Sequence, residues 1–148
     1  GLDEVRTGYI DKKAIDRAQS AIDQKEDDYS SEIEAVIVRV DSSWEDLKAE
    51  KDEKKRKKLK NELYNYANNV KDIAETFSYR LMGHFGKSLR DFCEKLDVTK
   101  EEHRIIVQAH IDVMWVAFQE NIRDDGGPVA EELKQIVAKA IKKHGGED

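Results

Sequence analysis

The chain has 148 residues, a formal net charge of −6, and 39% charged against 7% aromatic side chains. This length suits one domain, taken as residues 1–148, that can bury a core of its own. The negative charge argues against general nucleic-acid binding, the single cysteine (Cys93) excludes an internal disulfide, and no apolar run approaches the ~20 residues of a membrane span. We therefore expect a cytoplasmic protein without a membrane segment.

Helix-breaking residues are rare, with one proline and eight glycines, so we expect long helices rather than strands. A short helix is predicted over residues 11–24, with Asp11 as its N-cap, and the acidic run Glu26-Asp27-Asp28 is expected to interrupt the apolar pattern. A second helix is predicted over residues 29–49. Its apolar stripe recurs at helical spacing and consists of Tyr29, Ile33, Val36, Ile37, Val40, Trp44 and Leu47.

The lysine-rich segment Lys51–Lys60 is predicted to connect this helix to the next. A third helical region is predicted over residues 54–96. Because this is long for one helix in a compact domain, we expect a bend near Phe77-Ser78. Cys93 falls between apolar residues of this region and is predicted to pack in the core rather than to act as a nucleophile.

Thr99, followed by Glu102, has the spacing of a capping box and is predicted to start a helix that runs to Ile122. This helix is apolar over much of its circumference, so we expect it to be central. Its apolar surface is also compatible with a partner helix or a homo-oligomer.

Pro128 is predicted to open the last helix at its first position. Together these elements predict an all-α fold. We expect an antiparallel four-helix up-and-down bundle with its core at residues 29–144 and an extra N-terminal helix at residues 11–24.

The segment Ala67-Asn68-Asn69-Val70-Lys71-Asp72, followed by Phe77-Ser78-Tyr79 and later by Ser88-Leu89, resembles the active helix of histidine phosphotransfer (HPt) domains and the turn after it. In that family an exposed histidine is followed by a lysine three residues on and a glycine four residues on, and bacterial members often continue into a Phe-Gly-Tyr turn. Here Asn68 stands at the histidine position, Lys71 is retained, and Asp72 replaces the glycine. The resemblance covers roughly residues 8–140, most closely 63–127, and implies an HPt-like bundle in a phosphorelay.

In such a relay an imidazole takes a phosphoryl group from the aspartyl phosphate of a receiver domain. The amide nitrogen of Asn68 has a delocalised lone pair and cannot replace that nucleophile, while Asp72 adds negative charge where the phosphoryl group would sit. The resemblance therefore implies a two-component signalling protein that is not an enzyme and needs no cofactor. It would dock a response-regulator receiver domain or a histidine kinase through Asn68, Lys71 and Asp72 without carrying phosphate.

His84, with Lys87 three residues on, also fits the His-x-x-Lys spacing and is the alternative phosphate acceptor. A third interpretation is a structural or oligomerising helical module unrelated to phosphorelays. Of the other histidines, His103 is expected to be solvated in the first turn of its helix, and His110 to be a hydrogen-bonded interior or interfacial residue. No histidine has the Glu-x-x-His spacing of di-iron bundles, so we predict no metal site.

Overall fold

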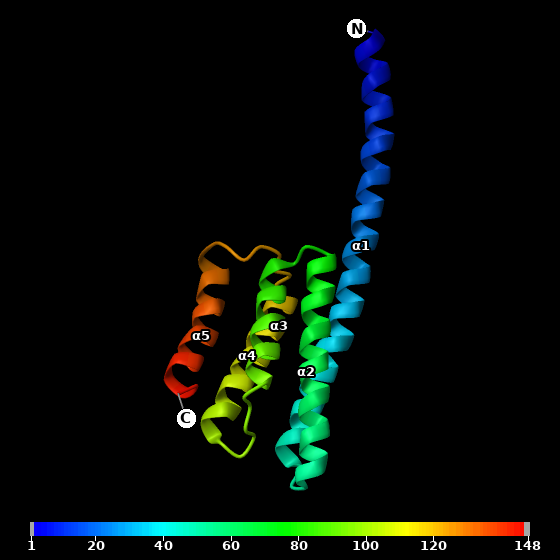
Figure 1. Ribbon diagram of the computed structural model, residues 1–148. Helices are drawn as coiled ribbons and strands as arrows, with labels where there is room; N and C mark the ends of the chain where they lie inside the picture. Colours follow the sequence, from blue (N-terminus) through cyan, green and yellow to red (C-terminus); the bar gives the residue numbers. More distant parts are fainter. Residues whose placement is uncertain (1, 147–148) are drawn as a thin grey trace.

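The computed structural model describes residues 2–146, with side chains from residue 11 onward, and these residues form five helices and no strand. The expected all-α fold is therefore confirmed. None of these helices is both long and apolar enough to cross a membrane. The helices are α1 (Leu2–Ala49), α2 (Glu53–Thr76), α3 (Arg80–Cys93), α4 (Glu101–Gln119) and α5 (Pro128–His144) (Figure 1).

α1 is one continuous helix of 48 residues. The predicted break at Glu26-Asp27-Asp28 and the predicted N-cap at Asp11 are both wrong, because both lie inside this helix. Acidic residues do not interrupt a helix when the apolar positions on either side keep the same phase, as they do here from Ala14 to Leu47. Almost all side chains at residues 11–28 are exposed, and this part of α1 stands clear of the other helices (Figure 1).

The second half of α1 is buried along the predicted stripe. All seven of its apolar residues, from Tyr29 to Leu47, are buried, which confirms that prediction. Two indoles also tie α1 to α4. Trp44 Nε1 donates a hydrogen bond to Gln108 Oε1 at 3.1 Å, and Trp115 Nε1 donates one to Asp41 Oδ2 at 3.1 Å.

The lysine-rich segment is mostly helical rather than a connection. The carboxylate of Asp52 accepts a hydrogen bond from the N–H of Lys55 at 3.0 Å and so caps the start of α2. The connection between α1 and α2 therefore shrinks to residues 50–52, and the lysines line the first turns of α2.

The expected bend near Phe77-Ser78 is instead a reversal of chain direction between α2 and α3 (Figure 1). Ser78 has a φ of 63°, in the left-handed region. The N–H of Tyr79 donates to Ala74 O at 2.8 Å and that of Ser78 to Glu75 O at 3.2 Å, which is the hydrogen-bond pattern of a Schellman motif. This position of a Schellman motif is usually a glycine. Because a serine occupies it here, the sequence pattern does not indicate a chain reversal at this point.

α4 begins without the predicted capping box of Thr99 and Glu102. Its N-cap is Lys100, and no side chain caps it. The N–H and hydroxyl of Thr99 instead donate to Asp97 Oδ1 at 3.0 and 2.6 Å, so Thr99 stabilises the preceding turn. Pro128 does open α5, as predicted.

The helices pack side by side around one core, with α2 between α1 and α3, and with α4 against α1, α3 and α5 (Figure 1). α4 is therefore central, as its apolar circumference predicted. The largest fully buried side chains come from α1 to α4 and include Trp44, Leu63, Phe85, Leu89, Ile111 and Met114.

The body of the molecule is closed at one end by two linked turns. α4 ends in a second Schellman motif, with Asn121 at a φ of 49°. The hydroxyl of Tyr79 donates to Asn121 Oδ1 at 3.1 Å, and the N–H of Arg80 donates to Arg123 O at 2.9 Å. Tyr29 of α1 stacks on Tyr79 with ring centroids 3.6 Å apart. The stacking on Tyr79 holds Tyr29 at this end of the body, and the exposed part of α1 begins just before it.

Candidate docking face on α2 and α3

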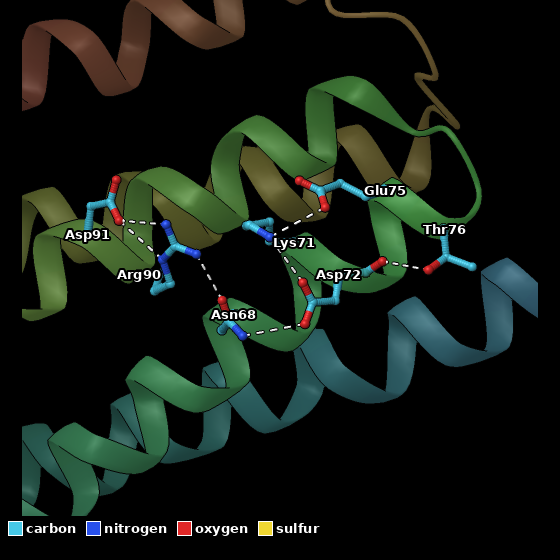
Figure 2. A network of polar contacts seen from close by, with 7 residues as sticks. All are labelled: Asn68, Lys71, Asp72, Glu75, Thr76, Arg90 and Asp91. Carbon is cyan, nitrogen blue, oxygen red and sulfur yellow. Dashed lines mark hydrogen bonds and ion pairs between the residues drawn. The ribbon is translucent and has the colours of Figure 1, made fainter.

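Asn68 and Lys71 lie one helical turn apart on a partly exposed side of α2, and Asp72 joins them (Figure 2). Asn68 Nδ2 donates to Asp72 Oδ2 at 3.4 Å, and Lys71 Nζ donates to Asp72 Oδ1 at 3.0 Å. Lys71 Nζ also donates to Glu75 Oε2 at 3.4 Å. The structure therefore brings together the three residues that the resemblance singled out.

Arg90 of α3 completes this surface, and sequence reasoning missed it. Its Nη1 donates to Asn68 Oδ1 at 2.9 Å, while its Nε and Nη2 donate to Asp91 Oδ1 at 3.1 and 3.0 Å (Figure 2). We refer to Asn68, Lys71, Asp72 and Arg90 as the Asn68 face. Local sequence pattern carries no signal for this contact, because Arg90 is 22 residues from Asn68 and belongs to another helix.

Gly86 explains how α3 comes close enough for that contact. A Cβ at this position would lie 2.7 Å from the backbone nitrogen of Lys71 and 3.0 Å from the carbonyl oxygen of Ala67. Only glycine therefore lets the two backbones approach at this point. Arg90 follows Gly86 by one turn of α3, which places its guanidinium beside the Asn68 turn of α2.

The two cations of the Asn68 face, Lys71 and Arg90, form ion pairs with carboxylates of the protein itself. The hydrogen bond that Lys71 donates to Asp72 is the main cause that raises the pKa of Lys71, and the hydrogen bonds that Arg90 donates to Asp91 are the main cause that raises the pKa of Arg90. Both cations are already engaged with carboxylates. The amide oxygen of Asn68 accepts from Arg90, and its nitrogen donates to Asp72. A phosphoryl group arriving here would meet no nucleophile and three nearby carboxylates, those of Asp72, Glu75 and Asp91.

His84 lies on α3 outside the Asn68 face. Its ring packs edge-on against Phe85 with centroids 5.7 Å apart. Burial is the main cause that lowers its pKa, and Lys134 of α5 acts in the same direction, while Asp125 opposes them. The charged groups around His84 therefore come from α5 and the loop before it, and also from Lys87 of α3 itself. Its role as an alternative phosphate acceptor stays a prediction.

The prediction of a solvated His103 is wrong. This side chain is buried, its Nδ1 accepts a hydrogen bond from the N–H of Asp97 at 2.9 Å, and its ring packs edge-on against Phe92 with centroids 5.1 Å apart. The imidazole folds back toward the preceding segment, where the N–H of Asp97 donates to it and the ring of Phe92 at the end of α3 packs against it. Burial lowers the pKa of His103.

The prediction of a hydrogen-bonded interior His110 is confirmed. This side chain is 0% exposed, with Nδ1 2.8 Å from Ile106 O and Nε2 2.8 Å from Ser88 Oγ. A carbonyl oxygen only accepts, so Nδ1 carries the proton and Nε2 accepts from the serine hydroxyl. Burial lowers the pKa of His110 to about 4, and the ring is therefore neutral at physiological pH.

A hollow with a volume of about 890 Å³ lies beside the first turns of α2. Five lysines and Cys93 contribute to its wall: Lys54, Lys55, Lys57, Lys58 and Lys60. The thiol of Cys93 is buried, and desolvation raises its pKa to about 12, so it stays protonated. The prediction that Cys93 packs in the core is confirmed.

Among the described residues, no three side chains of the types His, Cys, Asp and Glu are grouped so that they could hold a metal ion. No protein-family model, no curated protein and no solved structure matches the chain. The function must therefore be argued from the residues and their geometry.

Proposed function

We propose that this protein is a degenerate HPt-like module of a two-component signalling pathway. It docks a receiver or histidine kinase domain through the Asn68 face and carries no phosphate. In this proposal the second half of α1 and the helices α2, α3 and α4 correspond to the antiparallel four-helix bundle of the HPt family, and α5 is an addition that covers α4.

The observation that carries the proposal is the backbone at Ser78. In the HPt pattern a glycine stands between the phenylalanine and the tyrosine of the turn after the active helix. In this chain the corresponding residue is Ser78, and its φ of 63° is one that glycine adopts most easily. The chain thus makes the turn that the family pattern predicts, although the glycine is absent. This agreement supports the register that aligns Asn68 with the phosphate-accepting histidine.

The contacts of the Asn68 face support docking rather than phosphate transfer. An active site of this type needs an exposed imidazole with a lysine free to neutralise the phosphoryl oxygens. Here Lys71 is paired with Asp72 and Glu75, and the amide of Asn68 is held between Asp72 and Arg90. These pairs form a fixed polar surface of mixed charge, which suits recognition of a protein surface.

Reconstruction of the missing histidine tests the register. We expect Asn68→His, combined with Asp72→Gly, to take up an acid-labile phosphoryl group from phosphoramidate, a small-molecule donor that phosphorylates imidazole. The matched control is Asn69→His, which puts the same group on an exposed neighbouring position of α2. The wild-type chain should remain unlabelled. Equal labelling of Asn69→His, or no labelling of the reconstructed site in a folded variant, would contradict the register.

Docking itself is tested with a panel of receiver domains held in the active state by beryllium fluoride and Mg²⁺. We expect at least one to bind, and Arg90→Glu to weaken that binding on the order of tenfold, because it reverses the charge of the side chain that contacts Asn68 from α3. If the wild-type chain is labelled and His84→Gln removes the label, the alternative acceptor on α3 is correct instead.

A further inference from the structure

α2 is longer than α3, which packs beside it, and its first turns extend past the end of α3 (Figure 1). Cys93, the last residue of α3, lines the hollow of about 890 Å³ together with Tyr64 of α2. α2 begins at Glu53, about 16 Å further back along its axis. The side of α2 that α3 covers later in the helix is therefore open here. We call this space the lysine hollow, after the five lysines in its wall: Lys54, Lys55, Lys57, Lys58 and Lys60.

The lysine hollow concentrates positive charge on an acidic chain. Residues 51–60 contain seven basic and two acidic side chains, although the whole chain has a net charge of −6. Within the part of the chain that the structure describes, none of the five lysines forms an ion pair. The wall holds two carboxylates, Asp52 and Glu94, and that of Asp52 already caps α2. The lysines therefore outnumber the carboxylates around them and have charge to offer a ligand.

The wall also has an apolar part. Tyr64 is half-buried and packs against the hydrophobic core, and the buried thiol of Cys93 is neutral. The carbon stems of the lysines add further apolar surface beneath their charged ends. A ligand that fits the lysine hollow therefore combines negative charge with an apolar group.

We propose that the lysine hollow binds a short acidic segment of a partner protein that carries one large apolar side chain among its carboxylates. The carboxylates pair with the lysines, and the apolar side chain contacts Tyr64 and Cys93. Asn68 follows Lys60 by about 12 Å along α2, so this site is separate from the Asn68 face. The proposal does not depend on the function proposed for that face.

Size and surrounding charge favour a short peptide over a long polyanion. A volume of about 890 Å³ is in the range of pockets that hold a compact ligand. Outside residues 51–60, acidic side chains outnumber basic ones, so a nucleic acid or an anionic membrane that extends beyond the lysine hollow meets repulsion. A short acidic segment contacts the lysines alone. Exposed lysines also speed its association by electrostatic attraction.

Fluorescence anisotropy with a defined probe tests the proposal. The probe is a short fluorescein-labelled peptide of glutamates around one central tryptophan. We expect the wild-type chain to bind it at physiological ionic strength, and Lys54→Glu/Lys57→Glu to raise the dissociation constant at least about tenfold. Both lysines are exposed, and both also border a second hollow of about 730 Å³ beside residues 96–99. Their reversal therefore removes cations from both sides of this part of α2.

The matched control is Lys142→Glu/Lys143→Glu, which makes the same change in net charge on two exposed lysines in the last turn of α5. This variant should bind the peptide like the wild type, and so should Arg90→Glu on the Asn68 face. Absence of binding to the wild type, or equal weakening by the two lysine variants, would overturn the site.

Two further probes determine the class of ligand. A peptide with serine in place of the tryptophan should bind about tenfold more weakly, because it loses the apolar contact. An oligothymidylate of equal charge should also bind at least about tenfold more weakly than the tryptophan peptide. If the oligothymidylate binds as tightly or more tightly, the lysine hollow recognises negative charge or nucleic acid, and the assignment of an acidic protein segment is wrong.

Discussion

Ser78 is the residue whose backbone most clearly departs from what its side chain prefers. A left-handed φ costs an L-residue other than glycine about 1–2 kcal/mol, and the φ of Ser78 is 63°. We therefore expect Ser78→Gly to raise the free energy of unfolding by about 0.5–1 kcal/mol, as measured by urea denaturation. Asn121 is the matched comparison, since it occupies the same position in the second Schellman motif. Asn121→Gly should gain less, because it also loses the hydrogen bond from Tyr79. A destabilised Ser78→Gly would contradict the turn geometry.

His110 makes the stability of the fold sensitive to acid. Its pKa is about 4 in the folded chain against an unperturbed 6.5, so the unfolded state binds a proton first as the pH falls. Stability that is present above pH 6.5 is therefore lost on the way down to about pH 4, by about 3 kcal/mol at most. Burial lowers the pKa of His103 and of His84 as well, and both contribute with the same sign.

The variant His110→Gln isolates this contribution. It loses some stability at every pH, because the contacts to Ser88 and Ile106 change. The informative quantity is the slope of the unfolding free energy with pH, which should be shallower than in the wild type between pH 6.5 and about 4. Identical slopes would mean that His110 is protonated in the folded state.

At the scale of helices, the contact between α2 and α3 depends on two glycines in different ways. A Cβ at Gly86 would lie 2.7 Å from a backbone nitrogen of α2, which cannot move without separating the helices. We expect Gly86→Ala to cost about 1–3 kcal/mol of stability. At Gly83 the added carbon would lie 3.6 Å from the Cβ of Ala74, in ordinary contact. Gly83→Ala should therefore stabilise α3 by about 0.5–1 kcal/mol through helix propensity.

Thermal unfolding of these two variants gives the comparison directly. Gly86→Ala should also disturb the Asn68 face, since Arg90 would move away from Asn68 with the rest of α3. The expected result is a lower melting temperature, together with loss of the contact between the side chains of Arg90 and Asn68 in NMR spectra. Two alanine variants of equal stability would contradict the close approach at Gly86.

Sequence pattern predicted the helices well where one apolar stripe recurred over many turns. The stripe from Tyr29 to Leu47 and the proline at the start of α5 are as expected. Pattern failed where a short segment decided the geometry. The acidic run at residues 26–28 looked like a break, yet charged residues on an exposed helix carry little cost. The bend expected near Phe77-Ser78 has the predicted position, but its full reversal was not predicted because serine is an uncommon residue in the left-handed conformation.

The candidate site was predictable only in part. Asn68, Lys71 and Asp72 lie within one turn of a helix, so their proximity follows from spacing alone. The contact between Asn68 and Arg90 depends on how closely two helices pack, which depends in turn on the space at Gly86. Such a contact needs the tertiary structure. The buried setting of His103 was missed for the same reason, because Phe92 and Asp97 reach it across a turn.

At the scale of the whole molecule, α1 has an exposed first part and a buried second part, and removal of the first should leave the core folded. Its second half is part of the core, whose first buried residue among those described is Tyr29. The exposed residues before Ala21 contribute nothing to that core. We therefore expect a chain that lacks residues 1–20 to unfold, at low concentration, within about 0.5 kcal/mol of the full chain.

Urea denaturation of the full and the truncated chain under the same conditions measures this difference. Equal stability within about 0.5 kcal/mol is the expected result, because the described side chains that the truncation removes are exposed. A clearly lower stability of the truncated chain would mean that the exposed residues of α1 support the core directly.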